Sequence, residues 1–88
     1  MALRIPLRMY SVYDRKAESW SFPFKSDNNA TAIRDFSSLV LDGRTLVGQH
    51  PEDFDLFFVG TFGLSDGCIK SDPPQHIANG KDFKKEDK

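Results

Sequence analysis

The sequence lacks most of the features by which enzymes, membrane proteins and disulfide-stabilised domains are recognised. Its single cysteine, Cys68, cannot form an internal disulfide, so a disulfide framework is excluded. No apolar run approaches the roughly 20 residues that a membrane-spanning helix needs, and we expect no membrane association. Glycine-rich phosphate loops, nucleophile elbows and the helical HExxH motif are also missing. We therefore predict that the chain is not an enzyme and uses no cofactor.

The spacing of histidine and cysteine residues gives little support for a metal site. His50, His76 and Cys68 are scattered along the chain, and their spacing matches no zinc motif, so no metal is predicted. The segment His50-Pro51-Glu52-Asp53 is instead expected to shape the entry to a strand, because Pro51 fixes φ and the acids can cap a short turn.

The net charge of −1 conceals an uneven distribution of charge. Residues 1–34 hold six Lys/Arg against three acids, whereas residues 35–66 hold one Arg against six acids. The overall basic signature of a nucleic-acid-binding protein is therefore missing. The excess of Lys and Arg in the first third of the chain is still compatible with a local basic patch.

Residues 54–62 predict the central strand of the fold. Phe54, Leu56, Phe58 and Phe62 recur at even spacing and would share one apolar face, while the other face is mixed and includes Phe57 and Val59. A strand of this kind needs a covering layer on its apolar side.

The remaining elements predict a small α+β domain. The first hairpin is expected to consist of a strand over 8–13, a polar turn at 14–17 and a returning strand over 18–24 with Trp20, Phe22 and Phe24 on the core face. A helix should follow from about Ala30, capped by Ser26, Asp27 or Asn28 and ending at Gly43. After a loop, the central strand, a turn at 63–67 and a short strand over 68–70 complete the fold. Two β-hairpins thus flank one helix (ββαββ), and the helix covers one face of a four-stranded, mainly antiparallel sheet. The domain would span 1–71, and 72–88 would form a disordered, charged C-terminal tail because Asp72-Pro73-Pro74 interrupts regular structure.

Two kinds of interaction surface are predicted. Single-strand binders combine cations for phosphates with aromatic faces for bases, and the candidate nucleic-acid-binding residues are Arg8, Tyr13, Arg15, Lys16, Lys25 and Arg34. Tyr13, Phe57 and Val59 could alternatively form a protein interface. The competing interpretation of the first hairpin is an ordinary solvated turn. For Arg34, on the predicted helix, the competing interpretation is an ion pair with Asp35 or with an acid among Glu52, Asp53 and Asp55.

Five short motifs in register resemble a known family. They are Tyr13-Asp14, Pro23-Phe24, Ala32-Ile33-Arg34-Asp35-Phe36, His50-Pro51-Glu52-Asp53-Phe54 and Leu56-Phe57-Phe58-Val59-Gly60. In this order and spacing they resemble the small non-structural protein of gokushoviruses, single-stranded DNA phages of the Microviridae. The resemblance covers roughly residues 9–70.

The resemblance implies a non-enzymatic phage protein of the host bacterial cytoplasm that binds single-stranded DNA during genome synthesis or packaging. It supplies no active-site residues. The alternative is an adaptor or scaffold without direct DNA contact, which forms a homodimer or docks to a phage or host replication or packaging protein.

Overall fold

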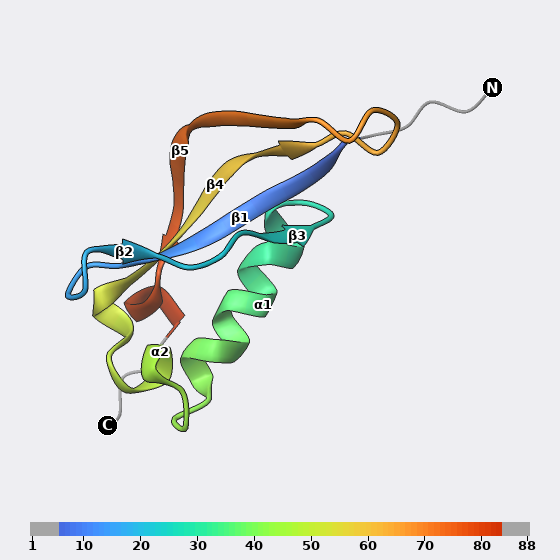
Figure 1. The fold of residues 1–88 in the computed structure, drawn as a ribbon. Coiled ribbons are helices and arrows are strands. Elements are labelled where there is room, and N and C mark those ends of the chain that lie inside the picture. Colours follow the sequence, from blue (N-terminus) through green and yellow to red (C-terminus); the bar gives the residue numbers. More distant parts are fainter. Residues whose placement is uncertain (1–5, 84–88) are drawn as a thin grey trace.

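The computed structural model describes residues 6–83 and has one antiparallel sheet with one main helix (Figure 1). The strands are β1 (Leu7–Asp14), β2 (Ser19–Trp20), β3 (Phe24–Ser26), β4 (Phe54–Phe62) and β5 (Ile69–Asn79). Their order is β2-β1-β4-β5, and β3 pairs with β1 on the same edge as β2. Figure 1 shows α1 (Asn29–Leu41) and the short α2 (Leu46–Gln49) on one side of this sheet. The predicted α+β class and antiparallel sheet are confirmed.

Helix α1 forms where the sequence predicts it. The Asn28 side chain accepts a hydrogen bond from the Thr31 backbone N–H at 2.8 Å and so caps the first turn. Ala32, Phe36 and Val40 follow at intervals of four residues and are all buried. The helix therefore presents a narrow apolar stripe to the sheet. None of the described helices is long and apolar enough to cross a membrane.

The core lies between α1 and the central strands. β4 buries Phe54, Leu56 and Phe58, and β1 adds Tyr10 and Val12 from the neighbouring strand. Because alternate residues of a strand point to opposite faces, the residues between them face away from α1. We call that second surface the open face.

Phe62 does not lie on the predicted core face. The register of β1 and β4 shifts at Val59, immediately before the pair Met9–Gly60. One extra residue in a strand moves every later side chain to the other face, so Phe62 points to the open face. Gly60 has φ 154°, and a Cβ there would lie 2.3 Å from the Lys70 carbonyl oxygen, so only glycine fits this bulge.

The predicted returning strand over 18–24 is two short strands. Ser21 replaces the regular ladder between them: its N–H donates to the Val12 carbonyl at 2.8 Å, and its Oγ accepts from the Val12 N–H at 2.9 Å. Pro23 has no N–H to continue the pairing. The chain therefore leaves the sheet edge between β2 and β3.

This break separates three aromatic residues that were predicted to share the core face. Phe24 packs against the core. Trp20 is 45% exposed and contacts Tyr13 on the open face, and Phe22 is 92% exposed. The prediction is correct for Phe24 and wrong for the other two.

The predicted disordered tail is wrong for residues 72–83. β5 continues to Asn79, and a 3₁₀ turn, Gly80–Phe83, follows it. Residues 72–74 bulge opposite Val59, and β5 is an edge strand, so the two prolines cost the sheet few hydrogen bonds. Residues 84–88 lie outside the described part of the chain.

Phe83 supplies a direct test of this correction. Its ring packs edge-on against Phe36 with centroids 5.9 Å apart. We expect Phe83→Ala to destabilise the fold by about 2 kcal/mol, because it removes a half-buried ring from the core. Thermal unfolding followed by circular dichroism should show a fall of roughly 8–16 °C. The exposed neighbour variant Lys81→Ala is the control, and an unchanged midpoint for Phe83→Ala would restore the tail interpretation.

Candidate functional site

A continuous row of aromatic rings crosses the open face. Tyr13 and Trp20 have ring centroids 4.8 Å apart, Trp20 and Phe57 4.9 Å, and Phe57 and His76 5.2 Å. The row runs across four strands, β1, β2, β4 and β5, and its members are half-buried or exposed. We call these four residues the aromatic row.

Strand pairing explains how residues so far apart in sequence meet. Tyr13 lies opposite Trp20 in the first hairpin, and Phe57 lies opposite His76 in the second. Directly opposed residues of antiparallel strands project to the same face. The pairing of β1 with β4 then joins the two hairpins into one row.

A buried carboxylate lies beside the row. The side chain of Asp55 is only 3% exposed, and Arg15 binds it with two hydrogen bonds, Nε–Oδ2 at 2.6 Å and Nη2–Oδ1 at 3.1 Å. His76 Nε2 lies 2.9 Å from Oδ1, and Asn79 Nδ2 donates to the same oxygen at 2.9 Å. We call these four residues the Asp55 cluster.

Asp55 is held in its ionised form. Burial raises the pKa of its carboxyl, but the hydrogen bonds from Arg15, Asn79 and His76 together outweigh burial and lower the pKa below its usual value. An ionised carboxylate only accepts, so His76 must donate from Nε2. The cluster thereby fixes one ring of the aromatic row and ties the first turn to β4 and β5.

The structure brings together only part of the predicted nucleic-acid site. Tyr13 and Arg15 lie on the open face, and Lys25 projects there because it pairs with Met9. Arg15 is 57% exposed, but its charge is directed at Asp55. Val59, predicted for a protein interface with Tyr13 and Phe57, lies half-buried at the bulge.

The other predicted cations lie elsewhere. Arg8 donates from Nη2 to the Asn29 side chain at 3.0 Å and covers the Phe58 ring at 4.0 Å, on the side of α1. Lys16 lines a separate hollow. Arg34 is exposed on α1, and no ion pair within residues 6–83 includes it, so its predicted pairing with Asp35 or residues 52–55 is wrong.

The sequence reasoning missed Trp20 and His76. The signal for Trp20 was present: the four-residue turn 15–18 pairs position 13 with position 20, which puts both rings on one face. His76 carried no such signal, because the bulged course of β5 past Pro73-Pro74 brings it back to the sheet.

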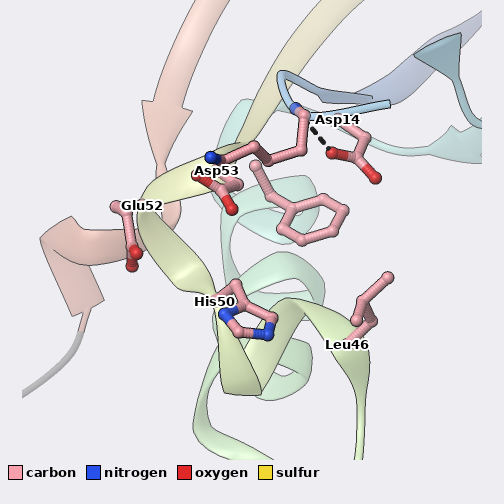
Figure 2. A pocket seen from close by; sticks show the side chains of 7 residues that line it. Asp14, Leu46, His50, Glu52 and Asp53 are labelled. Atoms are coloured by element: carbon pink, nitrogen blue, oxygen red, sulfur yellow. Dashed lines mark hydrogen bonds between the residues drawn. The ribbon is translucent and has the colours of Figure 1, made fainter. Parts of the chain in front are cut away.

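The hollow that Lys16 lines has a volume of about 600 Å³ and lies beside the turn that follows β1 (Figure 2). Figure 2 shows Asp14 and Asp53 along one side of it and His50 and Leu46 along the other. Side-chain ligand atoms of His50, Glu52 and Asp53 lie within 4.8 Å of one another. Exposed acidic groups commonly approach one another in this way without a metal. The segment Pro51–Asp53 forms a 3₁₀ turn that leads into β4, as the sequence predicts.

The lone thiol lies apart from both sites. Cys68 is exposed immediately before β5, so the strand predicted from position 68 begins one residue later, at Ile69. Its backbone N–H donates to the Asp66 carboxylate at 3.0 Å.

Comparison with known proteins now places the chain in a family. Residues 7–83 match the model of the Phage ORF5 protein family, and the chain belongs to that family. Among individual relatives it is 39% identical over 62 residues to Protein ORF5 of Chlamydia phage 1, an alignment that covers 66% of this chain and 65% of that protein. No solved structure matches. The resemblance to a small phage protein is thus confirmed, and the match includes residues 72–79 of β5, which the sequence assigned to a tail.

The Asp55 cluster predicts an acid-sensitive fold. Because the pKa of Asp55 is lower in the folded chain, its contribution to stability is present above the unfolded pKa and is lost as pH falls through the folded pKa. We expect the midpoint temperature of unfolding to decrease when the pH is lowered below about 4.

Asp55→Asn tests this assignment. Loss of the charge-assisted hydrogen bonds should cost about 2 kcal/mol near pH 7. In acid, the midpoint temperature of the variant should also depend less on pH than that of the parent. The exposed carboxylate variant Asp35→Asn is the control. Equal acid sensitivity in parent and Asp55→Asn would show that another group causes it.

Proposed function

We propose that this phage protein binds single-stranded DNA through its open face, in the cytoplasm of the infected bacterium, and acts stoichiometrically without turnover. The observation that carries the proposal is the aromatic row. Each base has an apolar face, and stacking on aromatic side chains binds any base sequence with about 1–3 kcal/mol per base. A sheet that displays aromatic rings on an uncovered face is a suitable surface for unstacked bases.

The charges around the row favour weak rather than tight binding. Lys25 is exposed on the open face, whereas Arg15 is largely neutralised by Asp55. A strand that contacts one or two cations releases few counterions, so affinity should fall only gently with salt. Stacking would then supply most of the binding free energy.

Trp20 allows a direct test because it is the chain's single tryptophan and belongs to the row. Titration of an unlabelled oligothymidine should quench its fluorescence as bases stack on the ring. We expect Trp20→Ala to weaken binding roughly 5- to 100-fold, the loss of one stacked base, as measured by anisotropy of a labelled oligonucleotide.

The control for this experiment is Leu64→Ala, an exposed apolar residue in the turn between β4 and β5. It should bind as the parent does. Absence of binding by the parent chain at about 50 mM salt would reject the proposal, since electrostatic attraction is strongest there. The alternative, a protein-binding adaptor, would then be favoured.

The predicted cations form a matched pair of variants. Lys25→Ala should weaken DNA binding at every sequence and reduce the slope of log affinity against log salt by about 0.7, the value for one phosphate of a single strand. Arg34→Ala should leave both affinity and slope unchanged, because Arg34 is exposed on α1 on the opposite side of the sheet. Equal losses for the two variants would argue for unspecific charge attraction in place of binding at the open face.

A further inference from the structure

A second apolar surface lies on the other side of the sheet edge, and of the residues that line it only Trp20 also belongs to the aromatic row. A groove of about 540 Å³ runs between the segment that joins β2 to β3 and the C-terminal half of α1. Val12 and Phe54, both core residues, line it together with Leu39 of α1 and Val47 of α2. Residues of the hydrophobic core thus form part of the groove wall.

A protruding ring stands beside this groove. Phe22 lies at the groove and is 92% exposed, the highest value among the large apolar side chains of the described residues. Its position follows from the break at Ser21–Pro23, which leaves the chain unpaired between β2 and β3 (Figure 1). An apolar ring held outward by the backbone, next to an open apolar hollow, is unfavourable in water unless another surface covers both.

We propose that this surface is the contact between two copies of the chain, in which Phe22 of each copy enters the groove of the other. A two-fold interface requires one patch to complement itself, and this patch carries both a projection and a hollow. Its charged lining consists of Asp14 alone, so the groove would repel a phosphate backbone. An apolar protein surface is the occupant that fits.

The area available agrees with a weak dimer. An aromatic side chain buries about 150–250 Å², and Phe22 and Leu39 are both exposed at the groove. The Phe22 ring and the groove wall that receives its partner's ring give on the order of 400 Å² per copy, or about 800 Å² in all, which is the size of a weak, transient contact. Dissociation in the micromolar range is therefore expected.

Sedimentation of the full chain over a concentration series tests the proposal. The parent should change from monomer to dimer as its concentration rises from about 1 to 100 µM. Phe22→Ser should remain a single chain throughout, and its circular dichroism should match the parent because Phe22 makes little contact in the monomer. Leu39→Lys, on the opposite wall, should have the same effect, whereas Leu64→Ser at the far turn should still dimerise.

Each contrary outcome overturns the inference. If the parent remains monomeric at 100 µM, the groove does not bind a second copy, and a different protein is favoured as its partner. Association beyond the dimer would contradict a closed two-fold interface. Dimerisation that persists in Phe22→Ser places the contact elsewhere. The test is independent of DNA binding: Phe22→Ser should retain quenching of Trp20 by oligothymidine, so failure of one proposal does not imply failure of the other.

Discussion

The buried carboxylate of Asp55 is the constraint on which the open face depends. A charge in a nearly dry position is costly unless donors surround it. Here the donors come from two distant parts of the sequence: Arg15 in the first turn, and His76 and Asn79 at the end of β5. The requirement to satisfy one carboxylate therefore holds the two hairpins in a single register. The positions of the rings follow from that register.

The Asp55 cluster also determines the character of the surface above it. Arg15 shares Asp55 with His76 of the aromatic row, and its guanidinium is committed to that carboxylate. A positively charged residue that looks available in the sequence thus becomes a structural one. The open face is left mainly aromatic, which favours stacking over phosphate attraction as the source of binding free energy. The acidic middle of the chain contributes to this outcome through a single buried residue, whereas its other acids stay at the surface or pair locally.

Local patterns in the sequence were sufficient for α1 and β4, but not for features that depend on distant pairing. The capping residue Asn28 and the buried residues Ala32, Phe36 and Val40 each act within one helix, so their spacing predicts the helix directly. The alternation of Phe54, Leu56 and Phe58 does the same for β4. The bulge at Val59 depends on the register with β1, and the course of β5 through Pro73-Pro74 depends on its place at the sheet edge. Neither cause is visible in a window of neighbouring residues.

The candidate site divides in the same way. Tyr13 and Phe57 were predicted because they alternate with core residues of their own strands. Trp20 was assigned to the wrong face because its strand was treated as continuous, and its correct partner follows from the length of the turn.

Two proposed surfaces on one small chain have a physical consequence for function. The aromatic row and the groove beside Phe22 lie on different sides of the sheet, and Trp20 belongs to both because it sits at the edge where they meet. Under the proposed function, one weak stacking surface would give short-lived contacts with DNA. Two copies joined at their groove surfaces would present two rows on one particle, and the second contact with the same strand would be intramolecular, with a high effective concentration. Weak binding by each chain and weak pairing of chains would then reinforce each other. Under the proposed function such coupling would let the protein hold a long single strand and later leave it, since separation of the two copies returns each DNA contact to its own weak affinity.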